Sequence, residues 1–163
     1  MKTHIKDAIR SASAMLALFA YVGIAPAYAC TIGEPVRISL PLNGIDVSNA
    51  DRLRIADAVI EAKKWPGVEV QAVVIPGAYT KERSGEQLKD ERATDAVAYL
   101  KQLGIKSENI IVEKKTFTDE MVRKSDGTLD LYQIDTELVP LCPGGCQKLC
   151  DDPRITPRSR AIQ

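Results

Sequence analysis

The chain has 163 residues, 45% of them hydrophobic and 27% charged, and its 22 basic side chains balance 22 acidic ones. A net charge of zero argues against an electrostatic nucleic-acid binder. The only histidine, His4, lies in a segment that we expect to be removed, which excludes histidine-activated nucleophiles and histidine-ligated zinc from the mature chain. The acidic residues are scattered as on a solvated surface, so we expect no enzyme.

Residues 1–29 have the order of a secretory signal. Basic residues come first, at Lys2, Lys6 and Arg10; the mostly apolar run 14–25 follows, and Ala27-Tyr28-Ala29 has the small-x-small pattern of a cleavage site. The apolar run is shorter than the ~20 residues that span a bilayer, and no other segment comes close. We therefore expect cleavage before Cys30, no transmembrane segment in the mature chain, and a location outside the cytoplasm. The mature chain would keep 19 basic and 21 acidic residues, in a length typical of one domain.

The first half of the mature chain predicts strand, helix, strand. Residues 36–40 alternate as a strand does, and residues 41–44 form a turn. Ser48 with Asp51 resembles a capping box, so a helix should begin there and end at Trp65-Pro66-Gly67. We expect its apolar face at Leu53, Ala56, Val59 and Ile60, and Trp65 in the core. Residues 68–75 read as a strand covered on both faces.

The second half predicts helix, strand, strand. Ser84 and Gln87 suggest a second capping pair, and this helix should run to about Leu103, with Gly104 in the left-handed conformation that ends many helices. Residues 110–112 form a third strand and residues 129–139 a fourth. The Asp126-Gly127 turn signal between them predicts that the third and fourth strands pair as a hairpin.

The order β-α-β-α-β-β predicts an α+β sandwich in which two helices pack on one sheet. We expect one domain, residues 30–140, followed by a Cys-rich segment from 141 that becomes a disordered tail from Asp151 to Gln163. Pro76-Gly77 and Gly144-Gly145 lack the spacing and the lysine of a phosphate loop, so we expect no nucleotide cofactor.

The mature chain has four cysteines, an even number, which in a secreted protein favours two disulfides. Of the three possible pairings we prefer Cys142 with Cys146, across Pro-Gly-Gly, and Cys150 with Cys30. Zinc is a weaker interpretation, because the C-x3-C-x3-C spacing differs from the usual C-x2-C pairs. Lipidation of Cys30 is weaker too: Ala27 and Tyr28 depart from the lipoprotein pattern, and three thiols would remain.

The second helix carries one residue that its apolar pattern does not explain. Its core positions are Leu88, Ala93, Ala96, Val97 and Leu100, yet Arg92 falls on nearly the same side. A guanidinium there could capture a carboxylate ligand in bidentate fashion. Its stem could equally lie along the helix edge, or its head could pair with an acidic side chain and lock the preceding loop. Both interpretations stay open at this point.

The residues around Arg92 resemble a known family. Tyr79-Thr80 at a strand end, a polar loop, Leu88, Arg92-Ala93, Val97, Leu100 and Gly104-Ile105 are similar to the OmpA-like periplasmic domain, over about residues 34–140. The resemblance implies a mixed four-stranded sheet, a periplasmic location with outer membrane association, and noncovalent binding of peptidoglycan. In that family the helix Arg takes a carboxylate of the peptide stem's diaminopimelate, and an Asp after the Thr pairs with its ammonium.

The sequence departs from this family at the ligand site. Lys81 stands where the family has the Asp, the loop before Leu88 is shorter, and the helix-start Ser is Lys89. Glu82 or Glu86 could substitute for the missing carboxylate. The residues expected to bind ligand are Arg92, Thr80, Lys81, Tyr79, Glu82 and Glu86. The alternative is a diverged domain that has lost wall binding and serves as a protein interaction module in the envelope.

Overall fold

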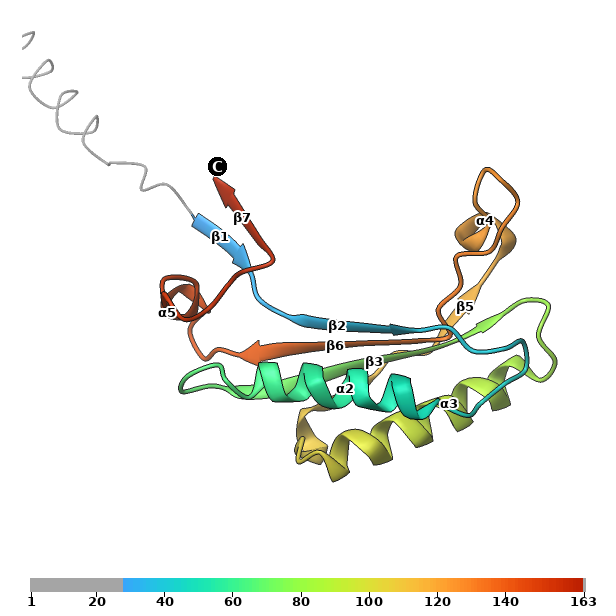
Figure 1. The fold of residues 1–163 in the computed structure, drawn as a ribbon, viewed down its shortest axis with the longest axis horizontal. Helices are drawn as coiled ribbons and strands as arrows, with labels where there is room; N and C mark the ends of the chain where they lie inside the picture. The colour runs from blue at the N-terminus through green and yellow to red at the C-terminus, as the bar shows by residue number, and fades with distance from the viewer. Residues whose placement is uncertain (1–27, 163) are drawn as a thin grey trace, which may run out of the picture. The chain divides into compact units, whose positions relative to one another are not determined.

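The computed structural model describes residues 28–162, so the expected signal segment lies almost entirely outside it. Residues 30–160 form one compact unit. The elements of the described chain (Figure 1) are β1 Tyr28–Thr31, β2 Glu34–Ile38, α2 Asn49–Ala62, β3 Glu69–Tyr79, α3 Gly85–Gln102, η2 Ser107–Asn109, β4 Ile110–Val112, β5 Lys115–Phe117, α4 Asp119–Val122, β6 Ile134–Leu141, α5 Gln147–Cys150 and β7 Ser159–Ile162.

The main sheet has the order β2-β6-β3-β4, with β5 also pairing with β3. β6 runs antiparallel to both β2 and β3, whereas β4 and β5 run parallel to β3. The mixed sheet is therefore confirmed, although it has five strands where four were expected, and the predicted hairpin between the third and fourth strands is wrong. The crossover through α3 places β4 on the far side of β3 from β6. The Asp126-Gly127 turn closes only a local hairpin, with one bridge between Arg123 and Leu129.

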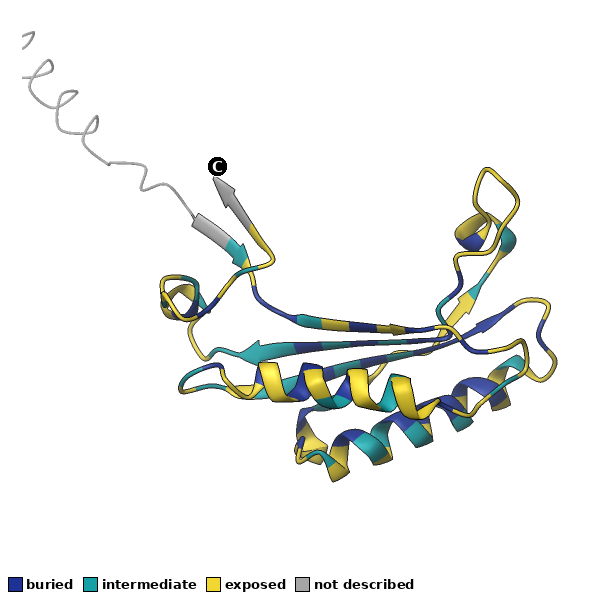
Figure 2. Ribbon diagram, in the orientation of Figure 1, coloured by how far each residue is buried: buried dark blue, intermediate teal, exposed yellow. Residues whose placement is uncertain are grey.

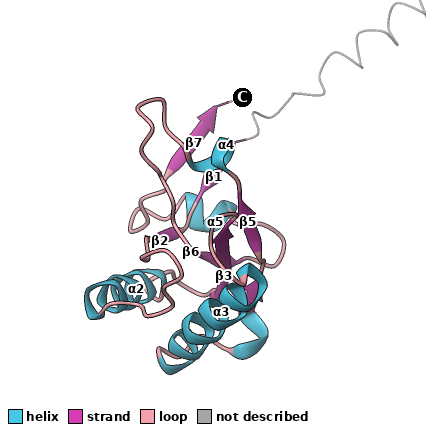
Figure 3. Cartoon of the chain, turned by 90° about the vertical axis from the view of Figure 1, so that its right-hand side faces the viewer, coloured by secondary structure: helices cyan, strands magenta, loops and turns pink. Residues whose placement is uncertain are grey.

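Both long helices cover the same face of the sheet (Figure 3). α2 contacts β2 and β6 through Ile55, Ala58, Val59 and Ala62, which are buried. The predicted apolar face was wrong in two positions, because Leu53 and Ile60 are more than half exposed. Figure 2 shows exposed and buried stretches alternating along α2. The helix instead buries a face made of Ile55, Val59 and two alanines. Trp65, at 7% exposure, lies in the core as predicted.

The helix ends follow the sequence in two places of three. The Ser48 hydroxyl accepts the Asp51 N–H at 3.1 Å, as the capping box predicts. Gly104 has a φ of +83°, as expected after a helix. Ser84 does not cap α3 with its side chain; its own φ is +52°, a left-handed conformation in which the predicted capping pair does not form.

The second half of β3 is buried on both faces. On one face α3 packs against it. On the other, the Phe117 ring lies directly on Gly77, where a Cβ would come within 1.9 Å of a ring atom. Only glycine fits at this position. β5 and α4 were missed in the sequence because residues 115–122 show no sustained periodicity.

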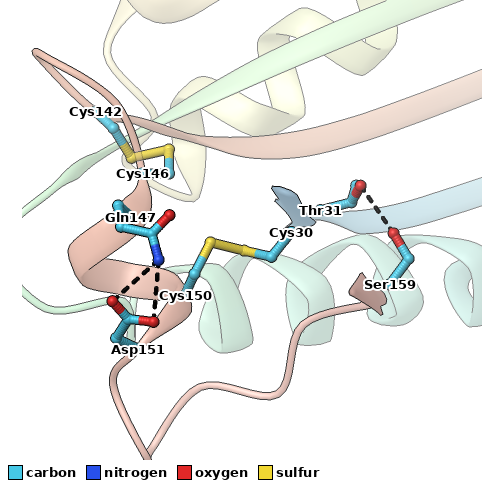
Figure 4. Close-up of a disulfide and its surroundings, with 8 residues drawn as sticks. All are labelled: Cys30, Thr31, Cys142, Cys146, Gln147, Cys150, Asp151 and Ser159. Carbon is cyan, nitrogen blue, oxygen red and sulfur yellow. Dashed lines mark hydrogen bonds between the residues drawn. A yellow bond between two sulfur atoms is a disulfide. The ribbon is translucent and has the colours of Figure 1, made fainter. Parts of the chain in front are cut away.

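The cysteines pair as preferred: Cys30 with Cys150 and Cys142 with Cys146, with Cα atoms 6.0 and 5.1 Å apart (Figure 4). The sulfur of Cys30 is thereby used and not free to carry a lipid thioether. The residues after Asp151 differ from the disorder we expected, since Ile155 is buried in the main core cluster.

No helix in the part of the chain that the structure describes combines the length and apolar character needed to cross a bilayer.

Candidate functional site

Arg92 lies in the interior of the protein. Its side chain has no exposed surface, and it is the largest of the completely buried side chains among the described residues. The helical pattern places it there: Leu88, Ala93 and Ala96 on the same helix are buried against the sheet. A guanidinium brought out of water in this way needs an acceptor for every N–H.

Each of its five N–H groups has one. Nε and Nη2 donate to the carbonyl oxygen of Gly44 at 3.0 and 2.7 Å, and Nη1 donates to the carbonyl oxygen of Gly77 at 2.6 Å. The remaining two donate to the carboxylate of Glu82, Nη1 to Oε2 at 3.1 Å and Nη2 to Oε1 at 2.6 Å. This is the parallel bidentate geometry that makes arginine–carboxylate pairs strong.

Glu82 is held as fully as its partner. Its side chain is completely buried, Oε1 accepts the backbone N–H of Asn43 at 2.7 Å, and Oε2 accepts that of Tyr79 at 2.8 Å. With the two bonds from Arg92, the carboxylate accepts four hydrogen bonds. The chain thus supplies its own carboxylate to the arginine that the family resemblance assigns to a ligand carboxylate.

The turn formed by residues 41–44 fixes the loop that carries Glu82. The turn 41–44 is closed by the Gly44 N–H on the Pro41 carbonyl oxygen, and the Asn43 side chain accepts the Arg83 N–H at 2.7 Å. Asn43 and Ser84 are the two non-glycine residues with positive φ in the described chain. Ser84 lies two residues after Glu82, and Asn43 donates its backbone N–H to the Glu82 carboxylate, so both left-handed residues adjoin this ion pair. Left-handed residues other than glycine cost about 1–2 kcal/mol, which the surrounding contacts must offset.

Lys81, which stands at the family's Asp position, also has a partner of opposite charge within the protein. The Lys81 ammonium lies 2.9 Å from Oδ2 of Asp119, the first residue of α4. Asp119 also accepts a hydrogen bond from the Tyr79 hydroxyl and, at 3.2 Å, from Arg123. Lys81 is exposed, so this pair is screened by water, but its charge is matched.

The other candidates do not join this cluster. Glu86 is exposed and lies 2.5 Å from the ammonium of Lys89, whose side chain is 6% exposed. Lys89 also donates to the Thr116 hydroxyl at 3.0 Å. Thr80 is exposed, and its backbone N–H donates to the Phe117 carbonyl oxygen at 2.9 Å. The structure therefore brings Arg92, Glu82 and Tyr79 together and leaves Glu86 and Thr80 outside.

Sequence reasoning missed four partners: Asn43, Gly44, Gly77 and Asp119. Gly44 and Gly77 act through backbone carbonyls, which no side-chain pattern reveals. Asn43-Gly44 does carry a turn signal that marks a left-handed residue, and it could have been noted. Among the described residues no group of three or more His, Cys, Asp or Glu side chains is placed to hold a metal ion.

The chain matches no protein family and no curated protein by sequence. Solved structures do resemble it. The C-terminal domain of Helicobacter pylori MotB, residues 125–256, superposes with a TM-score of 0.50 over 71% of this chain and 91% of that one, at 12% identity.

Two further structures superpose with lower TM-scores. The OmpA-like domain of FopA1 from Francisella tularensis has a TM-score of 0.46 at 16% identity, covering 73% of this chain and 82% of its own. The peptidoglycan-associated lipoprotein from Burkholderia pseudomallei has 0.44 at 14% identity, covering 66% and 90%. The chain has the α+β, OmpA-like fold expected from its sequence. At these identities the likeness shows the fold alone, so any ligand must be inferred from the residues of the site.

Proposed function

We propose that this chain is a non-enzymatic module of the bacterial envelope that binds another protein, and that its OmpA-like arginine site is filled by its own Glu82. The observation that carries the proposal is the complete use of the Arg92 donors by Glu82, Gly44 and Gly77. A stem carboxylate would find no N–H of this guanidinium unoccupied.

Replacing Glu82 by a ligand would be costly. An incoming carboxylate would have to displace Glu82, so at Arg92 it would only exchange one carboxylate for another. The hydrogen bonds from the Asn43 and Tyr79 N–H groups to Glu82 would be broken as well. The ammonium of a diaminopimelate stem would in addition meet Lys81, which is already paired with Asp119. Neither the carboxylate nor the ammonium of such a stem would meet an unpaired side chain of opposite charge at this site.

Binding of peptidoglycan peptide stems, the function that the resemblance implies, is the second candidate. One observation favours it. Arg92 keeps the bidentate geometry of a carboxylate clamp, and its present partner sits on a loop bordered by two left-handed residues, Asn43 and Ser84. A loop under such constraint could exchange Glu82 for a ligand carboxylate if the ligand made enough other contacts.

Calorimetric titration separates the two candidates. The oxidised mature chain, residues 30–163, is titrated with a soluble muropeptide that contains diaminopimelate. We expect no saturable heat. Saturable binding that is lost in the double variant Glu82→Ala/Arg92→Ala would overturn the proposal in favour of wall binding. The double variant is the proper control, because Arg92→Ala alone would leave the Glu82 carboxylate buried without a partner.

A further inference from the structure

A small pocket opens on the face of the sheet opposite the two long helices. Ile75 belongs to its floor; its neighbours Val74 and Pro76 point to the helix side, so Ile75 points away from it. In Figure 1, β5 and α4 rise from the end of the sheet on the side away from α2 and α3. We call residues 115–122, which form β5 and α4, the arm. The pocket lies between the arm and the sheet, on the opposite face of β3 from Arg92.

The wall formed by the arm is fixed by its own small core. Tyr79, Val122 and Leu131 are buried together and Phe117 packs against them, separately from the main core. Phe117 is further pressed onto the Gly77 backbone. The pocket is thus built on packed side chains, and we expect it to keep its shape in solution.

The lining suits one large apolar side chain. The pocket has a volume of about 160 Å³, well below the ~300–1,000 Å³ of sites that enclose a whole small ligand. Phe117 and Tyr132 contribute aromatic walls, and Met121 stands at the rim with 54% of its surface exposed. Aromatic and methionine side chains are enriched where protein surfaces bind partners.

The charges at the rim favour an acidic neighbour for that side chain. Arg37 lies 3.4 Å from Asp135, and Asp130 lies 3.7 Å from Lys124. Among residues 30–159, whose side chains the structure describes, Lys115 is the one rim charge without an ionic partner. Its ammonium lies 5.3 Å from the centre of the Phe117 ring, beside the apolar wall.

We propose that this pocket binds an extended segment of a partner protein through one large apolar side chain, with an adjacent carboxylate of that segment at Lys115. The inference deepens the proposed function, on which it rests for the nature of the ligand. It uses none of the residues around Arg92, so the two can fail separately.

The test is an NMR titration of the oxidised mature chain with N-acetyl-leucyl-aspartyl amide. Two matched probes accompany it: the leucyl-lysyl amide, which reverses the charge, and the seryl-aspartyl amide, which removes the apolar side chain. We expect shifts of the Met121 methyl, Tyr132 and Lys115 signals with the first probe that are clearly larger than with the other two. Lys115→Gln should weaken binding by about two- to fivefold, the range of an exposed ion pair, whereas Lys101→Gln on α3 should change nothing.

Equal shifts with the aspartyl and lysyl probes would overturn the role of Lys115. No shifts of these signals at about 10 mM probe would overturn the pocket itself. Met121→Ala, at an exposed position that leaves folding intact, should reduce the shifts of the Tyr132 and Lys115 signals, and unchanged shifts would overturn the role of Met121 at the rim. A muropeptide that binds in the calorimeter while the leucyl-aspartyl probe shifts Met121 would reject the proposed function and keep the pocket.

Discussion

Removal of the Glu82 carboxylate gives the sharpest test of the Arg92 site. Glu82→Ala leaves a completely buried guanidinium that has lost two of its five hydrogen bonds, and it also leaves the backbone N–H groups of Asn43 and Tyr79 unpaired. Breaking a buried pair from one side costs about 3–5 kcal/mol. For a chain of this size we expect Tm to fall by about 10–20 °C. Glu120→Ala, at an exposed position, is the matched control and should stay within about 0.5 kcal/mol.

The same variant should respond to acetate. The atoms that Glu82→Ala removes beyond Cβ form a CH2–COO⁻ unit, so acetate has the size and charge of the missing piece. It would meet the guanidinium and the two N–H groups that held Glu82. With a Kd of about 10 mM, 100 mM acetate would restore about 1.4 kcal/mol. Sodium chloride at equal ionic strength and neutral acetamide should restore much less.

Urea unfolding followed by circular dichroism, with and without acetate, measures both effects. A loss below about 1 kcal/mol in Glu82→Ala would refute the view that this pair locks the domain. A gain from acetate no larger than that from chloride would show that the space collapses on removal of the side chain, and that the geometry of a carboxylate site does not persist without Glu82.

Three further changes test the packing by chemical denaturation. Gln133→Leu should lower the free energy of unfolding by about 2–4 kcal/mol, because the Gln133 amide pairs with both the N–H and the carbonyl of buried Leu40, at 2.7 and 2.6 Å; no loss would mean that water replaces it. Thr136→Val should raise it by about 1 kcal/mol, since the buried Thr136 hydroxyl has no partner among the described residues; a decrease would reveal a hidden one. Replacing Cys30 and Cys150 by serine should lower it by about 4–5 kcal/mol, because this disulfide spans 120 residues; the shorter disulfide should matter less.

The elements that could be predicted are those whose signal is local. Strand alternation, the Ser48 cap and Gly104 depend on neighbours a few residues away, and all three are found in the structure. The pairing of β6 between β2 and β3 depends on contacts across the whole chain, and the Asp126-Gly127 turn suggested a different partner. Which face of α2 is buried likewise depends on its packing against β2 and β6.

The site shows the same division. The helical period alone indicates that Arg92 points inward, and the sequence left a ligand and an internal carboxylate as alternatives. Glu82 lies ten residues upstream, beyond the helix, so only the fold of the loop could show that it reaches Arg92. That loop adjoins the left-handed residues Asn43 and Ser84, and only Asn43, before Gly44, carries a local sequence signal for this conformation.

The disulfide between Cys30 and Cys150 also determines how the protein would carry a mechanical load. A force applied at Cys30 and at a point after Cys150 would pass through the covalent bond between their sulfur atoms, and the 120-residue span that contains the sheet and both long helices would be bypassed. In the oxidised state the domain could therefore be stretched between these two points without being unfolded. In the reduced state the same pull would run along the hydrogen bonds between β2 and β6.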